Sequence, residues 1–492
     1  MTIIPTEAPA DVMAGSATTV RTYGPRPDWR RGSGELGNQA GTIGRCIAFL
    51  TFASLLAATV ALNSFKIAGF PIRGVVAAGI LILAILFCFD EAKRAFKNNF
   101  AVLGLAAGLA VLGVFVSLVN GANLDAVLRS LTEVHVQAAI TLMVAAILAQ
   151  VAGPRACVFA IIAVIGISAC VAVGQMLDMP SAWALRSALG PLPNEATEGL
   201  DFTARRPTGL AYSPITFSTQ LCLAFAAFTA VRDKFRISTF GKSSADPGVM
   251  LALLALFAAC IACATRSPIL GGLMFLAAYS MQRRTSWLPL FLIVATVVIY
   301  LAWPLIMDVV QTNAPRVARA DDDSAAARLT MVYFGMRLFA DNPFGYGLTF
   351  EPMMLWGKYW PELYTMPAPA GVRVHDLHNY VMSMLNIYGL GILLLMPIVA
   401  KLLRRAGASL IFFVPYMVQI LFHNSGPFYN DNVIWFIIAA IAATSQATAT
   451  DVRTRDAYGG PRPRSSPRFG AAARFAAGRR SRILQPSTRR PA

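Results

Sequence analysis

Long apolar runs separated by short polar segments dominate the middle of the chain. A helix that crosses a bilayer needs about 20 such residues. The pattern predicts an all-α polytopic membrane protein with about 12 transmembrane helices, at residues 43–62, 74–89, 100–119, 138–151, 157–176, 210–231, 249–264, 269–281, 287–307, 380–400, 410–422 and 433–446. The runs at 269–281 and 410–422 are short, so each of them borrows polar flanks, tilts, or dips without crossing.

The polar segments predict the domain organisation and the topology. Residues 1–41 and 448–492 are expected to be disordered cytoplasmic ends around a transmembrane domain at 42–447. No apolar core of a signal peptide occurs in the first 40 residues, so the first run is expected to stay as a span. About two thirds of the Lys and Arg residues lie in the ends and alternate loops that this topology puts inside, as the positive-inside rule requires. The largest outer loop, 308–379, with a helix expected at 324–340, is the first place to look for function.

Composition and charge agree with a membrane protein. The chain is 56% hydrophobic and 14% charged, and its mean hydropathy is +0.58, which excludes a set of ordinary soluble domains. The net charge of +17 gathers in the inner loops and the C-terminal tail. It therefore indicates topology and attraction to lipid headgroups, and no nucleic-acid partner is expected. The seven cysteines lie in or beside apolar runs and are interpreted as buried apolar side chains.

The four histidines, His135, His375, His378 and His423, all lie in segments that are predicted to face outward. His375 and His378 are one helical turn apart at the start of the tenth run, so they could face one outer cavity. One of them could be a general base, and the helix N-terminus beside them could bind a phosphate. Two other interpretations stay open. The string could be a polar helix cap, or, together with Asp376, a metal site.

Arginines also gather on the predicted outer side. Arg205 and Arg206 precede the sixth run, Arg266 occupies the tight turn between the seventh and eighth, and Arg328 lies on the predicted loop helix. Arg337, two and a half turns further along that helix, faces the opposite way. Guanidinium groups bind phosphate oxygens in pairs, so these arginines and a histidine at a membrane surface suit a diphosphate on a lipid carrier. Each arginine alone could equally extend to lipid headgroups.

Four short stretches carry a family resemblance. They are Arg206-Pro-Thr-Gly-Leu-Ala-Tyr-Ser-Pro-Ile-Thr-Phe, Thr265-Arg266-Ser267, Arg328 with Asp341-Asn-Pro-Phe-Gly-Tyr-Gly347, and His378-Asn379-Tyr380 leading to Tyr388-Gly-Leu-Gly391. With them, residues 205–395 resemble the O-antigen ligase and polysaccharide polymerase superfamily of bacterial inner-membrane glycosyltransferases. The resemblance implies a GT-C-like all-helical fold that acts on the periplasmic side of the inner membrane. Together with the charge pattern, this makes the large outer loop with its expected helix periplasmic and puts both termini in the cytoplasm.

The resemblance also implies an activity. Such an enzyme transfers a glycan from undecaprenyl diphosphate to an acceptor hydroxyl at the periplasmic face, with inversion and with no metal, ATP or other cofactor. The acceptor is either lipid A core or another lipid-linked repeat unit. By position, His378 matches the essential histidine of the family, and Arg266 and Arg328 match arginines that bind or activate the diphosphate. Further contacts with the diphosphate or substrate are expected from Arg206, His375 and Asn379.

Two functions without glycan transfer remain as alternatives. A transporter, such as a flippase of lipid-linked glycans, tends to keep ionisable residues at mid-membrane depth, and the interiors of the third to twelfth runs contain none. A scaffold for a secretion complex would leave the histidines and arginines unexplained. The string Asp321-Asp322-Asp323 could hold a metal as in soluble glycosyltransferases, but a helix cap is favoured because no nucleotide-binding α/β domain surrounds it.

Overall fold

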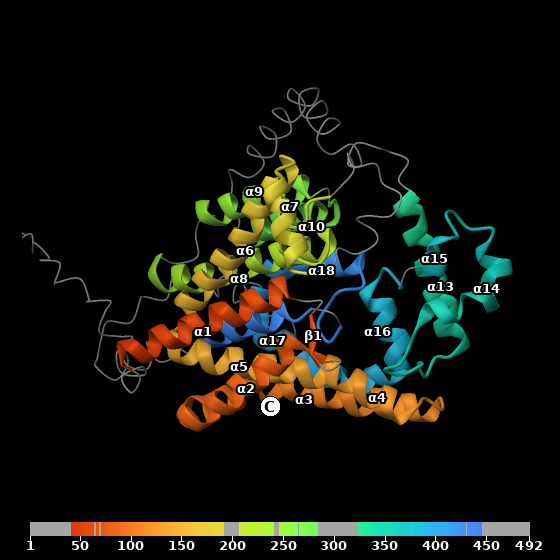
Figure 1. Cartoon of the computed structure of the whole chain (residues 1–492), viewed down its shortest axis with the longest axis horizontal. Coiled ribbons are helices and arrows are strands. Elements are labelled where there is room, and N and C mark those ends of the chain that lie inside the picture. The colour runs from red at the N-terminus through yellow and green to blue at the C-terminus, as the bar shows by residue number, and fades with distance from the viewer. Residues whose placement is uncertain are drawn as a thin grey trace, which may run out of the picture. The chain divides into compact units, whose positions relative to one another are not determined.

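The computed structural model describes residues 41–62, 65–67, 70–190, 206–240, 246–263, 265–283, 323–374, 376–429 and 431–444 (Figure 1). This part of the chain is almost wholly helical. Its strands are β1 (Lys66–Ile67) and β2 (Phe70–Pro71), which pair antiparallel with Ile67 opposite Phe70. The mostly helical architecture predicted from the apolar runs is confirmed.

Helices coincide with the predicted runs wherever the structure describes them; the run at 287–307 lies outside the described residues. The first half contains α1 (Thr42–Ala61), α2 (Ile72–Phe87), α3 (Phe89–Val119), α4 (Leu124–Leu131), the π-helical η1 (Thr132–Val136), α5 (Gln137–Ala152), α6 (Pro154–Met176), α7 (Pro180–Ala188) and α8 (Pro214–Phe240). Then follow α9 (Pro247–Ala262), α10 (Ser267–Arg283), α13 (Asp323–Asp341), the 3-10 helix η4 (Pro352–Met354), α14 (Trp356–Leu363), α15 (Gly371–Val374), α16 (Tyr380–Tyr388), the 3-10 helix η5 (Gly389–Leu395), α17 (Met396–Ala406), the 3-10 helix η6 (Gly407–Phe413), α18 (Val414–Leu421) and a last helix at Val433–Thr444.

Six helices of the described chain are long and apolar enough to cross a membrane. They cover Thr42–Ala61, Phe89–Val119, Leu124–Ala152, Pro154–Met176, Pro214–Asp233 and Tyr380–Arg405. Shorter apolar helices lie at Ile72–Phe87, Pro247–Ala262, Leu410–Leu421 and Val433–Thr444. The chain is therefore a multi-pass membrane protein, and the count of twelve spans stays a prediction.

The segment between the third and fourth apolar runs is helical, because α4, η1 and α5 make one continuous helix. The Asn123 side chain caps it by accepting a hydrogen bond from the backbone N–H of Asp125 at 2.8 Å. His135 consequently lies in η1, where it is buried and its Nε2 is 2.8 Å from the Tyr388 hydroxyl. The insertion of a π turn lets the helix continue through a polar stretch that hydropathy alone assigns to a loop.

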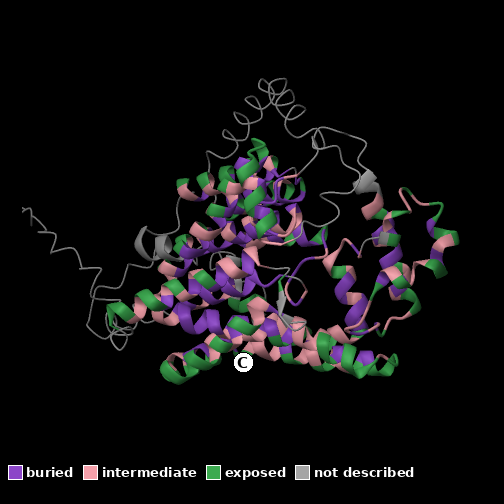
Figure 2. Ribbon diagram, viewed as in Figure 1, coloured by how far each residue is buried: buried purple, intermediate pink, exposed green. Residues whose placement is uncertain are grey.

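The helices form a packed interior with an apolar outer surface. In α8, 72% of the apolar window is buried, whereas the corresponding share in α3 is 28%. Figure 2 shows exposed segments, in green, along the outer helices. Large apolar side chains are among the exposed residues, such as Phe87 at 82% and Val111 at 72%. Apolar patches of this kind on a soluble surface would be unfavourable, whereas lipid covers them without cost.

The large loop contains a folded helical unit with its own core. Helices α13, α14 and α15 cluster together beside α16 (Figure 1). Their apolar side chains form a separate core of Met331, Phe334, Leu338, Tyr359, Leu363, Val372 and Leu377. The helix expected at 324–340 is confirmed as α13. This unit fixes the direction of α13, which carries Arg328 and Arg337.

Candidate functional site

His378 lies on the segment that leads into α16 and is half-buried. Its Nδ1 is 3.0 Å from the backbone carbonyl oxygen of Asp376. A carbonyl oxygen can only accept, so Nδ1 carries a hydrogen and donates it. In the neutral ring the lone pair then belongs to Nε2. His378 is thus held in the tautomer in which Nε2 can take up a proton.

A second histidine, His423, lies beside it just after α18. The centroids of the His378 and His423 rings are 6.5 Å apart. The His423 side chain is only 3% exposed, and its Nε2 is 3.2 Å from the Ser267 hydroxyl. Burial, followed by the positive charges of Arg328, His378 and Arg206, lowers the pKa of His423 well below its usual value. His423 is therefore neutral at physiological pH.

Two of the predicted arginines, from distant parts of the chain, act electrostatically on this histidine pair. Arg206 precedes α8 and donates from Nη2 to the backbone carbonyl of Cys263 at 3.4 Å. Arg328 lies on α13, and the positive charges of both arginines and of His378 act on His423.

The other two arginines are placed differently. Arg266 immediately precedes Ser267 at the start of α10, and its side chain is exposed. Arg337 forms an ion pair with Glu362 of α14, with Nε at 2.8 Å from the carboxylate. Arg337 is therefore paired within the loop unit, whereas the charge of Arg328 on the same helix acts on His423.

Buried hydrogen bonds hold the segment that carries Arg206. Gln175 of α6 accepts from two successive backbone N–H groups at residues 208–209, at 2.8 and 2.9 Å. Ser168 accepts from the next backbone N–H at 2.9 Å. Arg186 of α7 is fully buried and donates from Nε to the carbonyl of Ala211 at 2.7 Å. The segment before α8 is consequently a fixed platform for Arg206.

The glycine motifs form a joint between two helices. The backbone N–H groups of Tyr346 and Gly347 donate to the carbonyls of Asn386 and Ile387, at 2.7 and 2.9 Å. Gly345, Gly347 and Gly389 have φ values of 88°, 86° and 59°, which favour glycine. The joint fixes the end of α13 against the end of α16. The motifs therefore set the geometry between the helix of Arg328 and the helix that follows His378.

Asn379 stabilises the start of α16. Its Oδ1 accepts from the backbone N–H of Met382 at 3.0 Å, which makes it the N-cap of α16. Its Nδ2 donates to the carbonyl of Leu421 at 2.9 Å and so ties α16 to the end of α18. The expected substrate contact of Asn379 stays a prediction. His375 lies outside the described residues.

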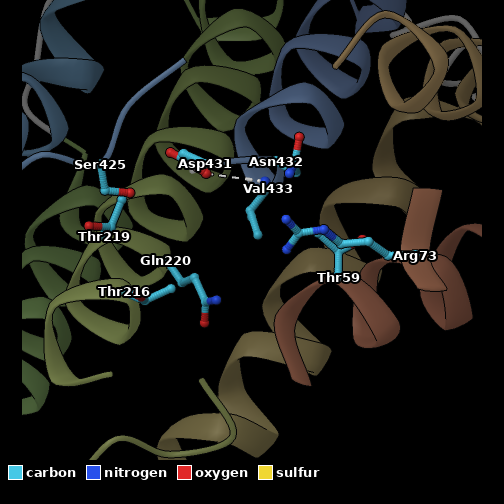
Figure 3. Close-up of a pocket in the computed structure, with 9 residues that line it drawn as sticks. All are labelled: Thr59, Arg73, Thr216, Thr219, Gln220, Ser425, Asp431, Asn432 and Val433. Carbon is cyan, nitrogen blue, oxygen red and sulfur yellow. Dashed lines mark hydrogen bonds between the residues drawn. The ribbon is translucent and has the colours of Figure 1, made fainter. Parts of the chain in front are cut away.

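A small polar pocket that sequence reasoning missed lies close to the site (Figure 3). Its volume of about 10 Å³ is close to the space of one buried water molecule. Burial raises the pKa of Asp431 to about 6, and the Asp431 carboxylate accepts from the backbone N–H of Val433 at 3.1 Å. Of the polar side chains that line it, only Thr216 belongs to one of the motifs quoted above; the full set is Thr59, Arg73, Thr216, Thr219, Gln220, Ser425, Asp431 and Asn432.

Gln419 of α18 connects the pocket to the histidines. Its Nε2 is 2.7 Å from the Ser218 hydroxyl and 3.5 Å from that of Thr219, which lines the pocket. Its Oε1 accepts from the Ser267 hydroxyl at 2.5 Å. A continuous polar network therefore runs from α8 through α18 to His423.

Comparison with known proteins agrees with the motifs. Residues 251–399 match the family model described as O-Antigen ligase. No curated protein matches the chain. The matched region includes Arg266, Arg328 and His378, whereas Arg206 and His423 lie outside it. The resemblance drawn from the motifs is confirmed, and it supports a ligase- or polymerase-type function. Over residues 251–399, this multi-pass membrane protein is therefore similar to the O-antigen ligase family.

Proposed function

We propose that the chain transfers a glycan from undecaprenyl diphosphate to an acceptor hydroxyl at the periplasmic face of the bacterial inner membrane. The observation that carries this proposal is the pair of rings of His378 and the buried His423, 6.5 Å apart, on which the positive charges of Arg206 and Arg328 act. One basic nitrogen and two fixed positive charges are what this reaction requires. The family match over residues 251–399 supports the same class of chemistry.

The histidine takes the proton. The acceptor hydroxyl attacks the anomeric carbon of the donor sugar from the face opposite the diphosphate, and its proton passes to Nε2 of His378. The new carbon–oxygen bond forms while the bond from the anomeric carbon to the diphosphate oxygen breaks, so the configuration inverts. A general base of this kind contributes about 10²- to 10⁴-fold to the rate.

The arginines stabilise the leaving group. Undecaprenyl diphosphate departs with the electron pair, and negative charge develops on its bridging oxygen. Arg206 and Arg328 oppose that charge from fixed positions, and a single well-placed donor of this kind is worth about 10²- to 10³-fold. The exposed Arg266 is assigned to the phosphate that is farther from the sugar, on the side where the lipid carrier enters from the bilayer. The diphosphate linkage already activates the donor, so the proposed step needs neither ATP nor a metal.

Complementation of a deletion strain tests the proposal. Envelope glycans are compared by gel after rescue with the wild type, His378→Ala, Arg328→Ala and the matched control Arg337→Ala. We expect rescue by the wild type and Arg337→Ala, and none by the other two at equal membrane abundance.

The pattern of the lost glycan separates the acceptors. Loss of polymer from lipopolysaccharide while lipid-linked polymer persists indicates a ligase. Single repeat units in place of long chains, or loss of secreted polysaccharide, indicate a polymerase. Unchanged glycans and full rescue by every variant would contradict glycan transfer and favour the flippase or scaffold.

A further inference from the structure

The protons around His423 can be assigned one by one, starting from Gln419. The Ser218 hydroxyl donates to the backbone carbonyl of Ile215 at 2.8 Å, so toward Gln419 it can only accept. The atom of Gln419 that lies 2.7 Å from Ser218 is therefore the amide nitrogen. The same nitrogen is 3.5 Å from the carbonyl of Ile215, which also requires a donor. The amide oxygen of Gln419 consequently faces Ser267.

The orientation of Gln419 fixes the tautomer of His423. Ser267 has one hydroxyl hydrogen, and it is donated to the Gln419 oxygen at 2.5 Å. In its 3.2 Å contact with His423, Ser267 must then accept, so Nε2 of His423 carries the ring hydrogen. The neutral ring has its lone pair on Nδ1. His423 is thus held in the opposite tautomer to His378, whose Nδ1 donates to Asp376.

Nδ1 of His423 is a buried acceptor that meets no hydrogen-bond donor in the described part of the chain. Leaving such an atom unsatisfied is unfavourable, and native proteins do so rarely outside functional sites. Imidazole geometry directs Nδ1 away from the Ser267 contact of Nε2. The half-buried His378 ring is 6.5 Å away, which is close enough for one sugar residue to contact both histidines.

The chemistry of Nδ1 selects its ligand. An atom that can only accept cannot bind an ionised diphosphate, whose oxygens also only accept. Arg206 and Arg328 act on His423 with positive charge, which disfavours a cationic ligand. A neutral hydroxyl satisfies both conditions because it donates a hydrogen bond and carries no charge.

We propose that Nδ1 of His423 accepts a hydrogen bond from a hydroxyl of the acceptor glycan, so that His423 forms an acceptor subsite beside His378. This inference rests on the proposed glycan transfer and adds to it the side on which the acceptor binds. Arg206 and Arg328 hold the diphosphate of the donor, and the two histidines hold the acceptor. His378 removes one hydroxyl proton, while His423 positions the sugar through a different hydroxyl.

Two isosteric substitutions separate the two nitrogens of His423. Asparagine places its amide oxygen near the position of Nδ1, so His423→Asn keeps the acceptor and loses the contact with Ser267. Glutamine places its amide nitrogen near the position of Nε2, so His423→Gln keeps that contact and loses the acceptor. A structural role through Ser267 and a binding role through Nδ1 therefore predict opposite orders of activity.

The test measures initial rates with purified protein in lipid nanodiscs. The donor is lipid-linked glycan extracted from the deletion strain. The acceptor is lipopolysaccharide, or lipid-linked repeat units, extracted from the same strain. We expect His423→Gln to raise the KM for the acceptor about 10-fold, with kcat and the KM for the donor within about twofold of wild type. His423→Asn should keep the KM for the acceptor within about threefold of wild type.

Other results would overturn the inference in distinguishable ways. Equal KM values for His423→Gln and the wild type, or a larger defect in His423→Asn, would assign the contact with Ser267 as the only role. A rise in the KM for the donor would move His423 to the diphosphate side. A wild type that transfers nothing to either acceptor would overturn the proposed function and this inference with it.

A measurement without substitution at His423 covers the case in which both variants fail to fold. The chain has four histidines, so solid-state ¹⁵N NMR of histidine-labelled His378→Ala protein leaves three to resolve. We expect one unprotonated Nδ1 signal that shifts on addition of the acceptor extract and stays in place with undecaprenyl diphosphate. The absence of that shift would overturn the inference.

Discussion

Arg328 and Arg337 lie on the same helix, but their surroundings differ completely. The charge of Arg328 acts on the buried His423, whereas Arg337 pairs with the exposed carboxylate of Glu362. An exposed ion pair contributes little to stability. A positive charge beside a developing negative charge in a protected site is worth far more. Both residues are arginines, so the difference between their surroundings comes from their positions along α13.

This difference makes a matched pair of substitutions informative. We expect Arg328→Ala to lower the rate of glycan transfer about 10²- to 10³-fold, while Arg337→Ala changes it by less than about threefold. Initial rates in nanodiscs, normalised to the amount of folded protein, measure both. Similar losses in the two variants would show that α13 contributes through its fold and that Arg328 has no special role.

His423 makes the stability of the protein sensitive to acid. Its pKa is lowered in the folded state, so below about pH 6.5 the unfolded chain binds more protons than the folded one. The contribution of His423 to stability is complete above that pH and decreases as the pH falls. Asp431 acts in the opposite direction. Its raised pKa of about 6 means that stability is lost as the pH rises through that value.

The sign can be measured with His423→Gln. Compared with the wild type, this variant should lose less of its Tm between about pH 7.5 and 5.5, because it lacks the group that protonates on unfolding. Asp431 is present in both proteins, so its opposite contribution cancels in the comparison. Equal Tm losses in the two proteins would show that His423 takes up its proton at the same pH in the folded and the unfolded state, against the lowered pKa.

Some of these residues could be predicted from the sequence and others could not, and the reasons are physical. His378, Arg328 and Arg206 stand in motifs or at helix ends, and polar residues in such places need an explanation. His423 follows an apolar run without any motif, and its role depends on Ser267, which is 156 positions away. Contacts between residues so far apart in the sequence are set by tertiary packing, which a hydropathy pattern does not predict.

At the scale of elements, the joint between α13 and α16 decides how the site is assembled. Gly347 has a φ of 86°, and a Cβ there would lie 2.5 Å from Cα and 2.6 Å from N of Ser117 in α3. The backbone of α3 would have to distort to accommodate a Cβ at those distances. The glycine motif is thus explained by the close packing of three segments, without any contact with a substrate.

Gly347→Ala should therefore destabilise the protein by about 1–3 kcal/mol or more. Glycan transfer should fall with it, because α13 and Arg328 shift relative to α16. Gly104→Ala in α3 is the control, since its Cβ would meet nothing within 4 Å, and helix propensity favours alanine. Thermal unfolding followed by fluorescence size-exclusion chromatography compares them. A Gly347→Ala protein as stable and active as Gly104→Ala would contradict the close packing.

The hydropathy pattern predicted where the helices lie. It did not predict which helices are continuous or how the large loop folds. Apolar runs mark helices in lipid because each backbone group must bond within its own helix. Hydropathy did not predict the π turn at Thr132–Val136 or the short α14, because neither has a run of apolar residues. The aromatic residues of α14 instead bury one face against α13, as Tyr359 does against Phe334 at 5.6 Å between centroids.

At the scale of the whole molecule, the proposed reaction requires the site to face the periplasm, where lipid-linked glycans are joined. The predicted topology puts the loop unit of α13 to α15 outside and the basic end of α17 inside. Met354 is 79% exposed beside the loop unit, and Lys401 is exposed on α17. Cysteines at these two positions therefore report opposite sides of the membrane. The exposed Cys46 and Cys170 are first replaced by alanine to remove the background.

In intact spheroplasts, a membrane-impermeant maleimide should label Met354→Cys and leave Lys401→Cys unlabelled until the cells are lysed. The reason is that the helix Tyr380–Arg405, which is long enough to cross the membrane, separates the loop unit from the basic end of α17, and short basic segments are retained in the cytoplasm. Labelling of Lys401→Cys alone would invert the topology. It would put His378, Arg206 and Arg328 on the cytoplasmic face and so overturn the proposed transfer at the periplasmic face.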